Sequence, residues 1–215
     1  MRPGADPRGG GTPPRGSGHF RGPSSREPDG AARSQKVAEV LRALRALPGS
    51  AGAGATTVNP LAGGTWVAPI EAEGIAAPDA RSQFLANFRL ATPGLVPALG
   101  MTLLEGRDFG AADDAGALPA AIVSRSLARR FWGNATALGR RLRIAEGRSP
   151  AWRTVVGVVA DVADAGEVRD TWYVPYDQAS GAAGSEEIYL MVRAAPGVEP
   201  ASLGNAAARA VARVD

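Results

Sequence analysis

Residues 118–132 read Leu-Pro-Ala-Ala-Ile-Val-Ser-Arg-Ser-Leu-Ala-Arg-Arg-Phe-Trp, which predicts a strand followed directly by a capped helix. Ala120 to Val123 is a short apolar run that fits a buried strand. Ser124 then takes the N-cap position, where its hydroxyl can accept a hydrogen bond from an amide of the first helical turn. The helix separates an apolar face from a basic one: Leu127, Ala128 and Phe131 against Arg125, Arg129 and Arg130. None of these residue types makes a reactive centre.

The spacing of apolar residues on either side of this stretch predicts the other elements. Helical spacing predicts helices over 36–47, 93–99 and 200–214, the second of them with Thr92 as its N-cap. Alternating or β-branched residues predict strands over 55–59, 66–73, 87–91, 141–144, 152–162, 171–174 and 187–193. Residues 103–109 read as the end of a strand and a turn. This order predicts an α+β fold with a mixed β-sheet in two lobes and helices packed on one side.

Composition divides the chain into a tail and a core. Residues 1–34 are rich in proline, glycine and arginine and have little to bury, so we expect them to be disordered. A basic tail that binds nucleic acid or acidic lipid is the alternative for this segment. Residues 35–215 carry equal numbers of basic and acidic residues, which argues against a nucleic-acid-binding face. The chain has no cysteine and no apolar run long enough to cross a bilayer. We expect no signal peptide, because the N-terminal residues lack an apolar segment.

Several short motifs could indicate chemistry, but each lacks the residues that the chemistry needs. Arg107 to Gly110 contains the kinase triplet Asp-Phe-Gly without a glycine-rich loop or a catalytic His-Arg-Asp motif. We expect Arg107 and Asp108 to fix a turn through a local ion pair or backbone hydrogen bonds. Asp113 and Asp114 lack the further oxygen ligands of a calcium loop, which favours a solvated loop.

Two further groups of residues leave alternatives open. Asp161 and Asp164 could act as a carboxylate pair in acid–base catalysis, although the only histidine, His19, lies in the tail. Tyr173, Pro175 and Tyr176 are expected in the core, or alternatively as a contact surface for a partner. The sequence thus predicts no catalytic residue, no cofactor and no metal site.

The motifs follow one another at spacings typical of one family: Glu105 to Phe109, Asp113-Asp114, Ala121 to Trp132, Leu138 to Arg140, Val155 to Asp161, and Tyr173 to Tyr176 with Gln178. Together they resemble the MacB-like periplasmic core domain of FtsX-type ABC permeases over roughly residues 35 to 215. The variety they resemble most is the large duplicated permease of acidobacteria. The resemblance implies a structural role for its motif residues: Arg107, Asp108, Ser124, Arg129, Phe131, Trp132, Gly157 and Asp161.

The resemblance also implies a function. Such a domain is non-catalytic, lies on the periplasmic side of the cell membrane, and couples membrane-helix motion to substrate export or to a periplasmic partner. Its expected partners are the permease's transmembrane helices, which we expect to be missing from this fragment, a separate ABC ATPase subunit, and a periplasmic or outer-membrane protein. No nucleic acid and no assignable small-molecule site are expected. The alternatives are a soluble ligand-binding or sensor module, and a carboxylate-dependent hydrolase.

Overall fold

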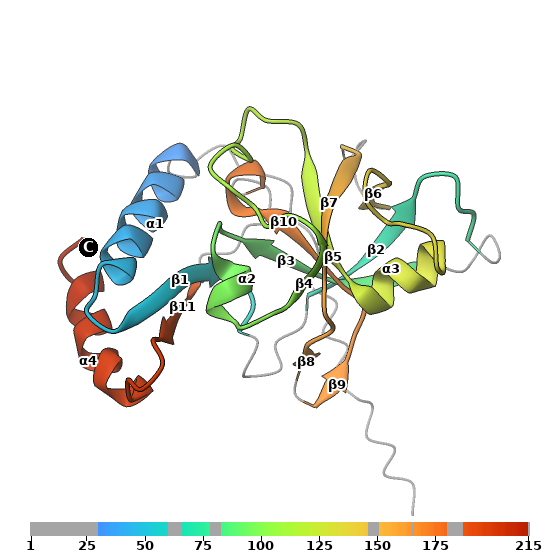
Figure 1. Cartoon of the computed structure of the whole chain (residues 1–215). Coiled ribbons are helices and arrows are strands. Elements are labelled where there is room, and N and C mark those ends of the chain that lie inside the picture. The colour runs from blue at the N-terminus through green and yellow to red at the C-terminus, as the bar shows by residue number, and fades with distance from the viewer. Residues whose placement is uncertain are drawn as a thin grey trace, which may run out of the picture.

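The computed structural model describes residues 30–59, 66–77, 83–145, 151–164, 166–179 and 187–214 (Figure 1). Its helices are α1 (Gly30–Arg45), α2 (Leu95–Ala98), α3 (Arg125–Trp132) and α4 (Pro200–Val211), with a 3-10 turn η1 (Tyr176–Gln178). Its strands are β1 (Ser50–Thr56), β2 (Val67–Ala72), β3 (Phe84–Ala91), β4 (Leu103–Gly106), β5 (Ala120–Ser124), β6 (Arg141–Ile144), β7 (Arg153–Val159), β8 (Ala163–Asp164), β9 (Glu167–Val168), β10 (Thr171–Pro175) and β11 (Tyr189–Ala194).

The main sheet is mixed and closes on itself. Its strands follow the order β10-β5-β7-β6-β2-β3, and β3 pairs again with β10, so these strands form a small barrel. The β3–β10 and β5–β7 pairs are parallel and the other pairs of the ring are antiparallel. A barrel this narrow is filled by side chains. Here the filling includes Ile70, Phe88, Leu142 and Trp172, each at most 4% exposed. The predicted α+β fold with a mixed sheet is confirmed.

Helix α3 packs onto the barrel core, as its amphipathic pattern predicts. Leu127 is 0% exposed and Phe131 8%, and both belong to the same core cluster as the barrel interior. The predicted cap is confirmed, because the Ser124 hydroxyl accepts a hydrogen bond from the Leu127 amide at 3.3 Å. The exposed Arg129 lies on the solvent side. Gly133, with φ 61°, ends the helix.

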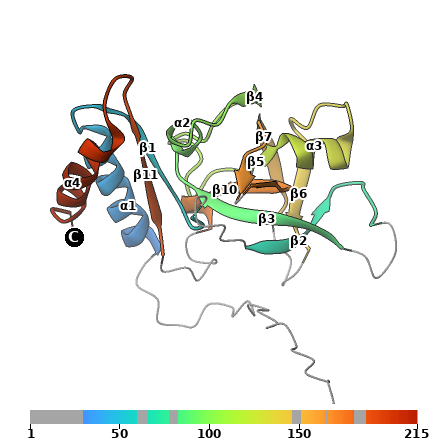
Figure 2. The same cartoon turned by 90° about the horizontal axis from the view of Figure 1, so that it is seen from below.

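A second lobe forms around the antiparallel pair β1–β11, which extends the main sheet beyond β3. Helices α1 and α4 pack together on this pair through a separate cluster of buried residues that includes Leu41, Leu44, Ala53 and Ala210. The two helices run in roughly opposite directions, and in the view of Figure 2 α1 begins and α4 ends at the same side of the lobe. The arrangement agrees with the prediction of two lobes.

Two local predictions need correction. Thr92 is not the N-cap of α2, because the helix begins later, after Gly94, and the Thr92 hydroxyl bonds to β1 instead. Helix α1 begins at Gly30, within the segment expected to be a disordered tail. Residues 1–29 of that segment lie outside the described residues, so the tail itself stays a prediction.

Candidate functional site

Asp161, one of the two carboxylates considered for catalysis, has a structural role. Its carboxylate accepts hydrogen bonds from the Ser126 amide at 2.7 Å and from Arg125 Nε at 3.2 Å, at the positive N-terminal end of α3. Partial burial acts to raise the pKa of Asp161, but these hydrogen bonds outweigh it and lower the pKa below its ordinary value. A general acid would need the opposite shift. The Asp164 side chain lies outside the described part of the structure. Among the described residues, no group of three or more acidic or histidine side chains could hold a metal ion.

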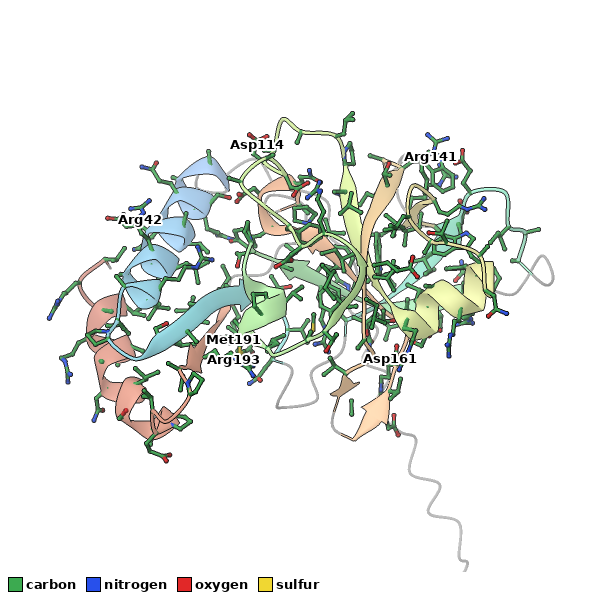
Figure 3. All side chains as sticks on the ribbon, in the orientation of Figure 1. Arg42, Asp114, Arg141, Asp161, Met191 and Arg193 are labelled. Atoms are coloured by element: carbon green, nitrogen blue, oxygen red, sulfur yellow. The ribbon has the colours of Figure 1, made fainter. Side chains whose placement is uncertain are left out.

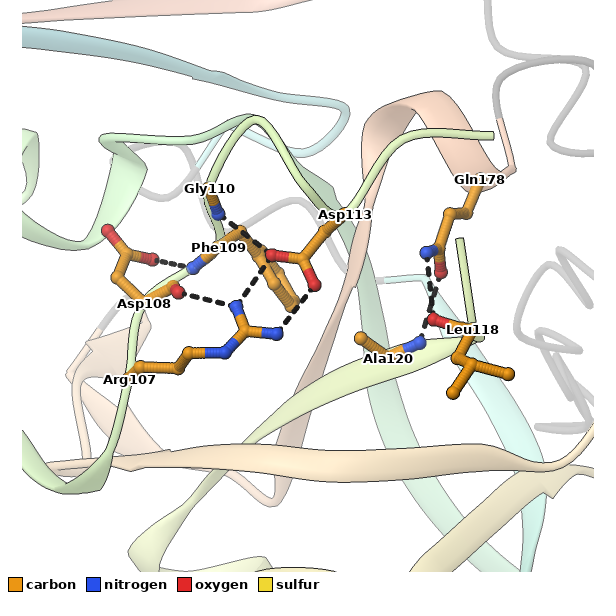
Figure 4. A network of polar contacts seen from close by, with 8 residues as sticks. All are labelled: Arg107, Asp108, Phe109, Gly110, Asp113, Leu118, Ala120 and Gln178. Carbon is orange, nitrogen blue, oxygen red and sulfur yellow. Dashed lines mark hydrogen bonds and ion pairs between the residues drawn. The ribbon is translucent and has the colours of Figure 1, made fainter. Parts of the chain in front are cut away.

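The loop that follows β4 is held by a partly buried ion pair (Figure 4). The Arg107 guanidinium donates to both carboxylate oxygens of Asp113, at 2.7 and 2.8 Å, and the Gly110 amide donates to the same carboxylate at 2.8 Å. Asp113 is only 5% exposed. The expectation of a solvated loop is therefore wrong for Asp113. The same expectation holds for Asp114, which is exposed and accepts a hydrogen bond from a nearby backbone amide.

Arg107 and Asp108 fix the turn through the backbone, which is one of the two expectations from the sequence. Arg107 Nη1 donates to the Asp108 carbonyl at 3.1 Å, and the Asp108 carboxylate accepts from the Phe109 amide at 2.8 Å. The expected local ion pair is replaced by the pair with Asp113. The two acids titrate differently, because the hydrogen bonds from Arg107 lower the pKa of Asp113 whereas burial raises the pKa of Asp108.

Gly157 allows this loop to lie directly on β7. A Cβ atom at Gly157 would sit 2.4 Å from the Arg107 carbonyl oxygen, closer than real contacts allow. The Arg107 amide donates to the Val156 carbonyl at 2.9 Å, which fixes the same close approach. The motif that contains Arg107 and the motif that contains Gly157 thus pack directly against each other. The spacing of the motifs in the sequence does not indicate this contact.

Gln178 ties η1 to the start of β5. Its Oε1 accepts from the Ala120 amide at 3.1 Å and its Nε2 donates to the Leu118 carbonyl at 3.2 Å (Figure 4). The same Oε1 also accepts from Arg153 Nη1 at 2.8 Å. Burial lowers the pKa of Arg153 to about 10. The sequence marked Gln178 as part of a motif, but no local pattern indicated this clamp.

An open depression of about 330 Å³ lies between this loop and the barrel. Most of its lining is apolar, with the Arg107–Asp113 pair at one wall: Arg107, Ala112, Asp113, Ala117, Leu118, Pro119, Ala120, Thr154 and Val156. Leu118 is 88% exposed at its margin. A second cavity, beside Arg89 and Tyr173, has only about 10 Å³, roughly the space of one water molecule. Neither is an enclosed apolar pocket of the kind that binds small molecules.

The two lobes meet at a junction between β1 and the end of β3. Thr56 pairs with Ala91, and the next residue, Thr92, donates through its amide to the Ala55 carbonyl at 3.0 Å. The Thr92 hydroxyl also accepts from the Ala55 amide at 2.7 Å, and the Thr57 hydroxyl accepts from a β3 amide at 3.2 Å. These threonines are buried. The junction is therefore a small, buried, hydrogen-bonded contact.

Helix α1 and helix α2 reinforce the junction. Arg45, the last residue of α1, donates to the Ala53 carbonyl at 3.0 Å and to the Pro93 carbonyl, one residue before Gly94. A Cβ atom at Gly54 would lie 2.4 Å from the Leu95 Cα, so α2 rests directly on β1. No local sequence pattern indicates the contacts of Arg45 with Pro93 and of Gly54 with Leu95, because they join residues 48 and 41 positions apart.

The predicted partner-contact surface is wrong. Tyr173 and Tyr176 are 4% and 3% exposed, and Pro175 is buried with them. Strand β10 runs between β3 and β5, and its outer side is covered near Met101, whose sulfur lies 3.7 Å from the Tyr173 hydroxyl. Strands covered on both faces carry apolar residues without alternation. The aromatic run belongs to the core, which was the other expectation.

The remaining motif aromatic is also structural. Trp132 stacks at a tilt against Phe131, with ring centroids 5.6 Å apart, and Phe131 meets Phe84 edge-on at 4.9 Å.

No helix in the described part of the chain combines the length and the apolar character that a membrane span requires.

Comparison with known proteins gives a consistent result. The family model of the MacB-like periplasmic core domain matches residues 11–210. No protein with a curated description matches the chain. Solved structures share the fold at low sequence identity. A domain assigned to a permease from Porphyromonas gingivalis has 24% identity and a TM-score of 0.53, covering 82% of this chain and 76% of its own.

Two further structures match as well. The periplasmic region of MacB from Actinobacillus actinomycetemcomitans has 13% identity and a TM-score of 0.57, covering 81% of this chain and 72% of its own. The extracellular domain of the ABC-type transporter YknZ from Gram-positive bacteria has 18% identity and a TM-score of 0.53, covering 91% and 89%.

Proposed function

This chain belongs to the family of MacB-like periplasmic core domains of ABC transporter permeases, and from this premise we propose that it couples membrane-helix movement to substrate export or to a periplasmic partner protein. The observation that carries the proposal is the arrangement of the outermost helices. Helix α1 begins and α4 ends at one side of the same lobe (Figure 2). Two membrane helices joined there would move this lobe as one body.

The junction supports transmission of that movement to the barrel. The lobe and the barrel share one continuous sheet, and their contact rests on the buried hydrogen bonds of Thr92 and the bonds that Arg45 donates. Packed cores and sheets move as bodies, because their interiors deform little. The barrel would thus follow the helices and present its outer surface, including the depression beside Leu118, to an extracytoplasmic partner.

The domain itself would do no chemistry in this proposal. The Asp161 carboxylate accepts a hydrogen bond from the Ser126 amide at the start of α3. Its pKa is lowered, and a carboxylate with a lowered pKa makes a poor proton donor. ATP hydrolysis would belong to a separate ATPase subunit, and the substrate would be set by the membrane part and the partner.

Affinity purification of the chain from its native host tests this proposal. A tag inserted in the chain at its chromosomal locus should recover it from detergent-solubilised membranes together with an ABC ATPase, identified by mass spectrometry. The same tag on an unrelated membrane protein of that host controls for non-specific capture. Recovery from the soluble fraction without any ATPase would contradict the proposal.

A further inference from the structure

Helices α1 and α4 together present a basic surface that the sequence does not reveal. We call basic face four of the exposed cationic residues of this layer, leaving out Arg45, which donates to two backbone carbonyls: Lys36 and Arg42 on α1, Arg209 on α4 and Arg213 just after it. The only carboxylate within the two helices is Glu39. Residues 35–215 are balanced in charge overall, so the fold concentrates positive charge here from two ends of the sequence.

Packing brings three of these four charges to one end of the lobe, whereas Arg42 lies in the last turn of α1. Ala210 of α4 lies in one cluster with Val40 and Leu41 of α1, and the two helices run in roughly opposite directions (Figure 2). Lys36 lies six positions after Gly30, roughly 9 Å along the helix axis from its start. Arg209 is in the last turn of α4 and Arg213 follows it. The three charges therefore lie toward the end at which α1 begins and α4 ends.

Acidic groups of neighbouring elements offset this charge only in part. Helix α1, which carries Arg33, contacts η1, which carries Asp177. Glu39 follows Lys36 by one turn. Arg209 and Arg213 have no acidic residue within α4 itself. Among the described residues, which do not include Asp215, the excess of positive charge is thus greatest at the end of α4.

We propose that the basic face binds the phosphate groups of anionic phospholipids at the membrane surface. The inference rests on the proposed function, which places the start of α1 and the end of α4 next to the bilayer. Cations within about 8 Å of an anionic surface are attracted to it, because electrostatic screening at physiological salt acts over that distance. Each basic residue near such a surface strengthens binding roughly fivefold. The contact would hold the lobe in a fixed orientation on the bilayer.

Vesicle co-sedimentation of the full chain tests the proposal. The probe is phosphatidylcholine vesicles with about one third phosphatidylglycerol, compared with phosphatidylcholine alone. The double variant Arg209→Gln/Arg213→Gln should reduce binding to the anionic vesicles roughly 20- to 30-fold, and high salt should remove the difference. The matched control is Arg129→Gln/Arg140→Gln, which removes equal charge from exposed positions in the barrel lobe. Arg141, next to the second control position, and Arg42 of the basic face lie at opposite ends of the molecule (Figure 3).

Three results would overturn the proposal. Equal loss in the control variant would indicate general charge attraction, and unchanged binding of the test variant would assign lipid binding to another segment, such as the arginine-rich residues 1–29. Equally strong competition by polyglutamate at matched charge would indicate an acidic protein as the occupant. The assay contains no ATPase and no membrane helix, so these failures leave the proposed function standing. Failure of that function would appear in the affinity purification instead.

Discussion

The Asp113→Asn variant should unfold more easily than the wild type, because the substitution breaks the ion pair that holds the loop after β4. The Asp113 side chain is 4% exposed and that of Arg107 is 54% exposed. Removing one partner of a buried pair costs about 3–5 kcal/mol. Water can reach the exposed guanidinium, so we expect a smaller cost here, about 2 kcal/mol. For a chain of this size, that lowers the melting temperature by about 4–8 °C.

Urea unfolding monitored by tryptophan fluorescence measures this cost, and its pH dependence tests the cause. The folded-state pKa of Asp113 is lowered, so the pair stabilises the protein above the ordinary aspartate pKa, and this contribution is lost as pH falls through the lowered value. The gap between wild type and Asp113→Asn should therefore be full at pH 7 and close as pH falls below about 4.

Asp108→Asn is the matched control, because it makes the same chemical change five residues away. Burial raises the pKa of Asp108, so its charge adds no comparable stability at neutral pH, and the Asp108→Asn variant should stay within about 1 kcal/mol of wild type. Equal destabilisation by the two substitutions, or a gap for Asp113→Asn that does not change with pH, would refute the reasoning.

Three further substitutions test other contacts of the fold. Ser124→Ala should cost about 2–3 kcal/mol in urea unfolding, since its hydroxyl caps α3 and also accepts a buried amide of β10 at 3.0 Å; a cost below about 0.5 kcal/mol would contradict the double role. Gly157→Ala should lower the melting temperature by several degrees through overpacking, whereas Gly52→Ala, with open space around it, should not. Thr92→Val should cost about 1–3 kcal/mol and speed hydrogen exchange of the Ala55 amide; unchanged exchange would show that the junction does not depend on this bond.

The local part of the fold could be predicted from the sequence, because its determinants lie within a few residues of each other. The strand before Ser124, the cap and the apolar stripe of α3 are all contained in residues 118–132. Closure of the barrel could not be predicted in this way. It depends on β3 pairing with β10, where Phe88 meets Trp172, and no local pattern encodes a partner 84 positions away.

The site was predicted less well, because burial of polar residues depends on distant partners. Asp113 reads as a solvated loop residue until Arg107 is placed on it. Tyr173 reads as a surface candidate until the segment around Met101 covers it. The basic face could not be predicted for a related reason, since a count of charges along the chain does not show which ends of the chain pack together.

Labelling of one introduced cysteine in living cells tests the central claim, an extracytoplasmic domain of a permease, most directly. The chain has no cysteine, and Asn205 is exposed on α4, so Asn205→Cys supplies a single reactive thiol. A charged maleimide that passes outer-membrane pores but not the inner membrane should label this thiol in intact cells, while a cytoplasmic control protein stays unlabelled. Labelling only after lysis would place the domain in the cytoplasm and contradict the account.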